Sequence, residues 1–85
     1  MADRTFRLDG WEFFLRERNG EWTINVPDCG GMADSVPKIP EQLAWAEREF
    51  ATLPGLKQTW PVTWTVPTDA FADLEALFKR HGSTG

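Results

Sequence analysis

Apolar and polar residues alternate along the first 26 residues of the chain, and two Asx-Gly pairs interrupt the alternation. The pairs are Asp9-Gly10 and Asn19-Gly20. A two-residue type I′ turn needs positive φ at both central residues, so such a pair between alternating segments predicts a tight β-hairpin. The N-terminal segment is therefore expected to form a three-stranded antiparallel meander.

The two turns also predict which side chains share a face of the meander, because side chains alternate between faces along a strand. The first turn places Leu8 opposite Trp11, and the second places Leu15 opposite Ile24. Both registers gather apolar side chains onto the same face. That face is expected to consist of Phe6, Leu8, Trp11, Phe13, Leu15, Trp22, Ile24 and Val26.

The other face of the predicted meander is polar. Arg7 stands opposite Glu12 on it, and Arg18 stands opposite Glu21, as cross-strand pairing favours. Phe14 is the one large aromatic residue that the register leaves on this face. An exposed aromatic side chain is a candidate anchor for a partner.

Residues 40–53 and 69–81 have the spacing of amphipathic helices. Pro40 suits the first helical position of the first helix, and Thr68 is a plausible N-cap for the second. Gly82 is expected to end the second helix as its C′ residue. The apolar positions are Leu43, Ala46, Phe50 and Leu53 in the first helix, and Phe71, Leu74, Leu77 and Phe78 in the second.

Residues 59–66 alternate in the manner of one strand, with Trp60, Val62, Trp64 and Val66 on its apolar side. Pro61 cannot donate a ladder hydrogen bond, so this is either an edge strand or a strand whose first residues are unpaired. The order β-β-β-α-β-α predicts an α+β fold, a two-layer sandwich with both helices on one face of the sheet. The 85 residues are expected to form one domain with a frayed tail at 82–85.

The charge of the chain restricts the class of partner. The formal net charge is −4, and after residue 26 eight acidic residues oppose five basic ones. A nucleic-acid interface needs a basic patch, so the tryptophans are assigned to the core rather than to a stacking platform, and no direct nucleic-acid binding is expected. An acidic surface suits a basic protein partner, or one that itself binds nucleic acid.

The chain has one cysteine and one histidine, Cys29 and His81. They cannot form an internal disulfide, they are too few for a structural zinc site, and no motif indicates a cofactor. The longest apolar run is far below the ~20 residues that span a bilayer. Without a signal peptide, the sequence predicts a cytoplasmic protein that does not enter a membrane. A small enzyme using Cys29 is an alternative, although no base is evident near the thiol.

Residues 27–40 read as a loop that is long for so small a domain, which is typical of functional loops. Trp45 lies off the apolar stripe of the first helix, beside Glu41 and Glu49. Either Trp45 anchors a partner, or the stripe is wider and takes Trp45 into the core. The residues expected to bind a partner are Phe14, Asp28, Met32, Asp34, Glu41, Trp45 and Glu49.

Three segments of the chain occur in the order seen in a known family. They are the hairpin of Trp11-Glu12-Phe13-Phe14-Leu15 and Asn19-Gly20, the stretch Val26-Pro27-Asp28-Cys29-Gly30, and the helix start Pro40-Glu41-Gln42-Leu43-Ala44. Residues 11–50 therefore resemble the N-terminal domain of HicB-type antitoxins. The resemblance implies a small α/β domain that binds and blocks a toxin and performs no catalysis.

The sequence thus favours a small acidic binding module over an enzyme. The expected function is to neutralise or inhibit a protein partner, as antitoxins, immunity proteins and phage anti-defence proteins do. The main alternative is a structural or assembly subunit that forms a homodimer through the edge strand at 59–66, because an edge strand offers unpaired backbone groups.

Overall fold

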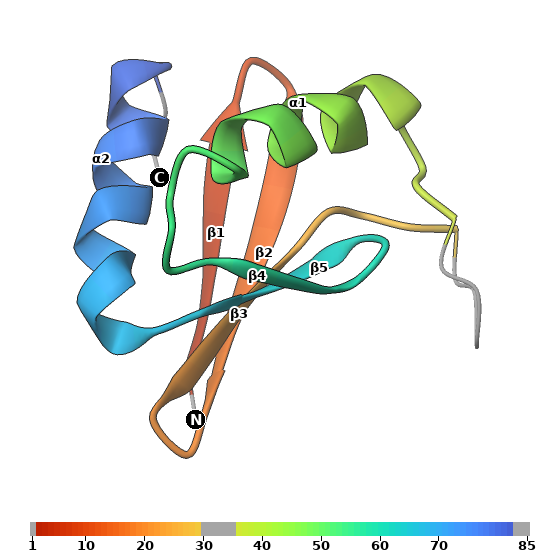
Figure 1. Ribbon diagram of the computed structural model, residues 1–85. Helices are drawn as coiled ribbons and strands as arrows, with labels where there is room; N and C mark the ends of the chain where they lie inside the picture. Colours follow the sequence, from red (N-terminus) through yellow and green to blue (C-terminus); the bar gives the residue numbers. More distant parts are fainter. Residues whose placement is uncertain (1, 30–35, 83–85) are drawn as a thin grey trace.

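The computed structural model describes residues 2–29 and 36–82, and both predicted hairpins are present in it (Figure 1). They join β1 (Ala2–Leu8), β2 (Trp11–Arg18) and β3 (Glu21–Asn25). The four turn residues all have positive φ, from 44° at Asp9 to 91° at Gly10. Leu8 pairs with Trp11 and Leu15 with Ile24, so the predicted register is confirmed.

The rest of the chain adds two helices and a third hairpin. The elements are α1 (Pro40–Phe50), β4 (Lys57–Trp60), β5 (Thr63–Val66), the 3-10 turn η1 (Thr68–Ala70) and α2 (Phe71–Arg80). The five strands form one sheet in the order β1-β2-β3-β5-β4, and every neighbouring pair is antiparallel. β1 and β4 are therefore the two edges of the sheet. The predicted α+β class is confirmed.

The prediction of a single strand over 59–66 is wrong. The segment turns back at Pro61-Val62, where the ring of proline removes a donor, and β4 and β5 pair with each other. Val62 and Trp64 are buried as expected, but the turn and a register shift in β4 break the alternation before them. Trp60 therefore pairs with Thr63 on the outer face and is 56% exposed, not part of the core.

Both helices are shorter than the sequence predicts. α1 ends at Phe50, and α2 begins at Phe71 after the 3-10 turn. Thr68 does not cap α2, because that place is taken by Ala70 and the Thr68 hydroxyl donates to the carbonyl of Gly20 at 3.3 Å. Gly82 has φ 92° and follows the end of α2, as predicted. None of the described helices is long and apolar enough to cross a membrane.

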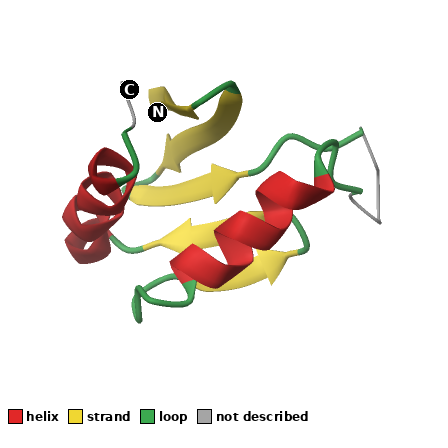
Figure 2. Cartoon of the chain, turned by 90° about the horizontal axis from the view of Figure 1, so that it is seen from above, coloured by secondary structure: helices red, strands yellow, loops and turns green. Residues whose placement is uncertain are grey.

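The two helices cover the same face of the sheet, with α1 across one end of it and α2 along the β1 side (Figures 1 and 2). The Phe13 ring of β2 lies at the centre, 6.2 Å from the ring of Phe50 and 5.0 Å from that of Phe78. One strand residue thus contacts both helices. We call the uncovered side of the sheet the open face; Phe14 lies on it and is 43% exposed, as expected.

Candidate functional site

The structure places the predicted binding residues on two separate sides of the molecule. Met32 and Asp34 lie outside the described residues. Phe14 and Asp28 line one broad cleft of about 740 Å³, together with Asn25 and Lys38. Trp45, Glu41 and Glu49 all belong to α1 on the other side of the sheet. The five predicted residues that the structure describes therefore do not form one site.

The broad cleft opens where β3 leaves β2. The ladder between these strands ends at Phe14 and Asn25, and beyond it the carbonyl of Glu12 accepts a hydrogen bond from Gln42 Nε2 at 2.7 Å. Gln42 is only 1% exposed, and it lies one turn before the buried Ala46. Its side-chain amide thus replaces the missing strand partner. This role is not among those that the sequence predicts, although helical spacing from Ala46 signals a buried position.

The lining of the broad cleft has no single chemical character. Its carboxylates stand beside basic groups: Asp3 Oδ1 lies 3.4 Å from Arg16 Nε, and Asp28 and Lys38 both line the wall. Backbone hydrogen bonds between residues 27–29 and 36–38 hold that wall together. Because charges of both signs alternate around the opening, the cleft favours neither anions nor cations.

A second, smaller cavity lies between the β1–β2 turn, α1 and the end of α2. Its volume is about 280 Å³, and we call it the tryptophan pocket; it is lined by Leu8, Asp9, Trp11, Trp45 and His81. The hairpin turn brings Asp9 next to Trp11, and the helices bring the other two side chains from far along the chain. This pocket combines two indole rings with a carboxylate, which the broad cleft does not.

Trp45 is half-buried, so the wider apolar stripe is the correct interpretation of α1. Its ring lies 5.5 Å from the ring of Phe13, 6.2 Å from that of Trp11 and 5.2 Å from that of His81, measured between centroids. The helix packs against the sheet on one side and against α2 on another. Trp45 therefore belongs to the edge of the core and also to the wall of the pocket.

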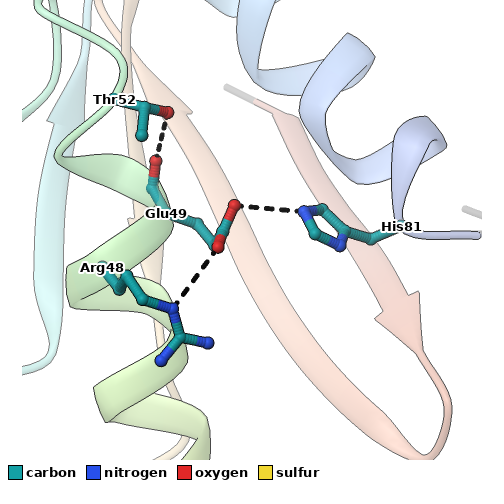
Figure 3. A network of polar contacts seen from close by, with 4 residues as sticks. All are labelled: Arg48, Glu49, Thr52 and His81. Carbon is teal, nitrogen blue, oxygen red and sulfur yellow. Dashed lines mark hydrogen bonds and ion pairs between the residues drawn. The ribbon is translucent and has the colours of Figure 1, made fainter.

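Glu49 joins the two helices (Figure 3). Its Oε1 lies 3.1 Å from His81 Nε2, and its Oε2 lies 3.5 Å from Arg48 Nε. Its backbone carbonyl accepts a hydrogen bond from the Thr52 hydroxyl at 2.6 Å. The carboxylate thus fixes the imidazole at the rim of the tryptophan pocket. Glu41 is exposed in the first turn of α1, about 12 Å along the axis from Glu49, and takes no part in this contact.

Cys29 is exposed at the start of the segment that leads away from β3. Its backbone N–H donates to the carbonyl of Val36 at 2.9 Å. The segment around residues 26–29 and the end of α2 lie at opposite ends of the molecule in both views (Figures 1 and 2). The fold therefore does not bring the thiol to His81, which is held by Glu49 instead.

No family model, no curated protein and no solved structure matches this chain. Within residues 2–29 and 36–82, no three His, Cys, Asp or Glu side chains are grouped as they would be around a metal ion. What the protein does is therefore inferred from its own geometry, and the tryptophan pocket is the concave site whose chemistry is most specific.

Proposed function

We propose that this chain is a small protein-binding module that neutralises or inhibits a basic protein partner. The observation on which this depends is the tryptophan pocket, where Trp11 and Trp45 stand beside the carboxylate of Asp9. Tryptophan is among the residues that most often anchor protein interfaces, especially at partly enclosed positions. A carboxylate at the rim selects for a positively charged partner.

The charge distribution supports the same partner. The helices α1 and α2 with the turn η1 contain six acidic residues and three basic ones. The five strands contain four acidic residues and five basic ones. The acidic excess therefore lies on the helix side, which also contains the tryptophan pocket. A basic protein approaching this side is attracted over several ångströms, which speeds association.

Proteins with this profile include antitoxins, immunity proteins and anti-defence inhibitors. The resemblance of residues 11–50 to HicB-type antitoxins spans β2, β3 and α1 and includes both Trp11 and Trp45. On this proposal the partner would be a toxin or another basic effector, which the chain blocks by covering its active surface.

The proposal is tested by affinity capture from the native host, followed by binding kinetics with each captured protein at low and high salt. A basic partner should associate more slowly at high salt and lose its activity in the complex. Glu41→Lys, on the helix side, should slow association more than Glu21→Lys, which changes the net charge equally beside the β2–β3 turn. If association is independent of salt, or the two variants behave alike, the proposal is wrong.

The edge strand β4 favours a second candidate function, that of an assembly subunit. Trp60 is 56% exposed on this edge, and all four residues of β4 are exposed. Edge strands pair readily with other chains. Sedimentation over a wide concentration range decides the matter: a dimer that Trp60→Thr abolishes would favour assembly, and a monomer at all concentrations would exclude a dimer through this edge.

A further inference from the structure

We propose that the tryptophan pocket is a receptor for a cationic side chain, an arginine of the protein partner. That the cation comes from a protein partner rests on the proposed function. That the pocket binds a cation at all rests on the geometry of the pocket.

The walls of the pocket are aromatic rings set at steep angles to one another. The ring centroids of Trp11 and Trp45 are 6.2 Å apart with an interplanar angle of 66°. The ring of His81 lies 5.2 Å from that of Trp45 at 80°. These edge-to-face contacts line the cavity with aromatic rings, and the negative face of an indole attracts a cation within about 6 Å of its centroid. The volume of about 280 Å³ admits a group of several heavy atoms.

Asp9 also lines the pocket and supplies its negative charge. The type I′ turn fixes its backbone at φ 44° beside Trp11, and its side chain is exposed. Among the residues that the structure describes, no hydrogen bond or ion pair engages the Asp9 carboxylate. It therefore has no competing cation from the described parts of its own chain. Its negative charge favours a cation over an anion such as phosphate.

The fold already holds one guanidinium by the same kind of chemistry. Arg4 lies 5.3 Å from the ring centroids of both Phe6 and Phe71, and its Nη2 lies 3.2 Å from Glu75 Oε2. Two aromatic rings and a carboxylate are thus sufficient to position an arginine in this protein.

The tryptophan pocket repeats these elements with stronger components. Trp11 and Trp45 replace the two phenylalanines, and indole is the best cation–π acceptor. Asp9 takes the place of the acidic partner. Within the described ranges no lysine or arginine lies over either indole, whereas Arg4 fills the other arrangement. A planar guanidinium also stacks on aromatic faces in a way that a compact ammonium does not, which favours arginine over lysine.

The experiment titrates the full chain with N-methylguanidinium chloride against a reference titration with sodium chloride of equal ionic strength. The indole N–H resonances of the five tryptophans are followed at constant pH. Those of Trp11 and Trp45 should shift along a saturable curve, and that of Trp60 on the opposite side should not. Equal responses to both salts would overturn the proposal.

Two variants isolate the carboxylate without altering the fold. Asp9→Asn keeps an Asx-Gly pair, so the turn is preserved, and guanidinium binding should weaken about fivefold, as loss of one charge-assisted contact implies. Glu21→Gln removes one charge beside the other turn and should leave binding unchanged. If Asp9→Asn binds as tightly as the natural chain, the pocket is not a cation receptor.

The same titration separates this inference from the proposed function. The chain could bind guanidinium along a saturable curve and yet capture no basic protein. That result would support the cation receptor and contradict the proposed function. The chain could instead bind a basic protein in a salt-dependent way while the resonances of Trp11 and Trp45 do not respond to guanidinium. That result would support the proposed function and contradict the proposal that the pocket is a cation receptor.

Discussion

Phe13 and Phe14 are neighbours in β2, yet they belong to different environments. Phe13 is fully buried, and its ring lies within 6.2 Å of the rings of Trp45, Phe50 and Phe78. Phe14 points to the open face and is 43% exposed. On the covered side, aromatic rings from the sheet and both helices pack together; on the open side, cross-strand ion pairs such as Arg7–Glu12 surround single apolar groups. The comparison shows that the same residue type stabilises the fold on one side and is available to a partner on the other.

The largest effect is expected where the covered face meets α1. Trp45→Ala removes a half-buried ring from the core and should lower the free energy of unfolding by about 2–3 kcal/mol, less than the 3–5 kcal/mol of a fully buried aromatic residue. Urea unfolding measures this, with Trp45→Phe as the control that keeps an aromatic ring. A change close to zero would mean that Trp45 serves the pocket alone.

Gly20→Val tests the turn on which the assignment of both faces depends. Gly20 has φ 80°, and a β-branched residue in that conformation should cost about 2 kcal/mol of strain, although no atom would obstruct the added Cβ. Gly20→Asn, which tolerates positive φ, should cost much less. The melting temperatures of the two variants give the comparison. If the valine variant has the same melting temperature as the natural chain, the turn is not type I′. The assignment of side chains to the two faces of the sheet would then be unsupported.

Phe14→Thr should be nearly neutral, within about 0.5 kcal/mol, because the residue it replaces is exposed and threonine suits a strand. The same urea experiment applies. A loss similar to that of Trp45→Ala would show that the open face is packed against something, and the contrast between the two faces would disappear.

The smallest effect concerns Glu17, at the end of the second hairpin. The backbone N–H of Gly20 donates to its carboxylate at 2.7 Å, and this hydrogen bond holds the pKa of Glu17 below its ordinary value. A lowered pKa in the folded state means that the contribution to stability is present above the unfolded-state pKa and is lost as pH falls through the folded one. Glu17→Gln should therefore be less stable than the natural chain at neutral pH, with the gap closing in acid. A gap that persists well below the folded pKa would point to packing rather than charge.

The sequence predicts only part of the tryptophan pocket. The sequence predicts Trp45 as a binding residue because it lies off the expected stripe, with Glu49 beside it; Trp45 does line the pocket, and Glu49 contacts His81 at its rim. The sequence predicts Asp9 and Trp11 only as parts of a turn and of the core, and it assigns His81 to no site. Their meeting depends on where α2 ends relative to the first hairpin, which spacing along the chain does not reveal.

Local sequence determined the two N-terminal hairpins and their faces, because positive φ at Asp9-Gly10 and Asn19-Gly20 is a property of those residues and a strand alternates strictly after its turn. Tertiary structure decided the rest. The segment after the turn at Pro61-Val62 pairs with β3 on one side and β4 on the other, and Gln42 is buried because β3 leaves β2 and frees the carbonyl of Glu12. Trp45 enters the core because two other elements pack around α1. The burial of Gln42 and of Trp45 depends on elements that are distant in the sequence, so no periodicity within α1 could reveal it.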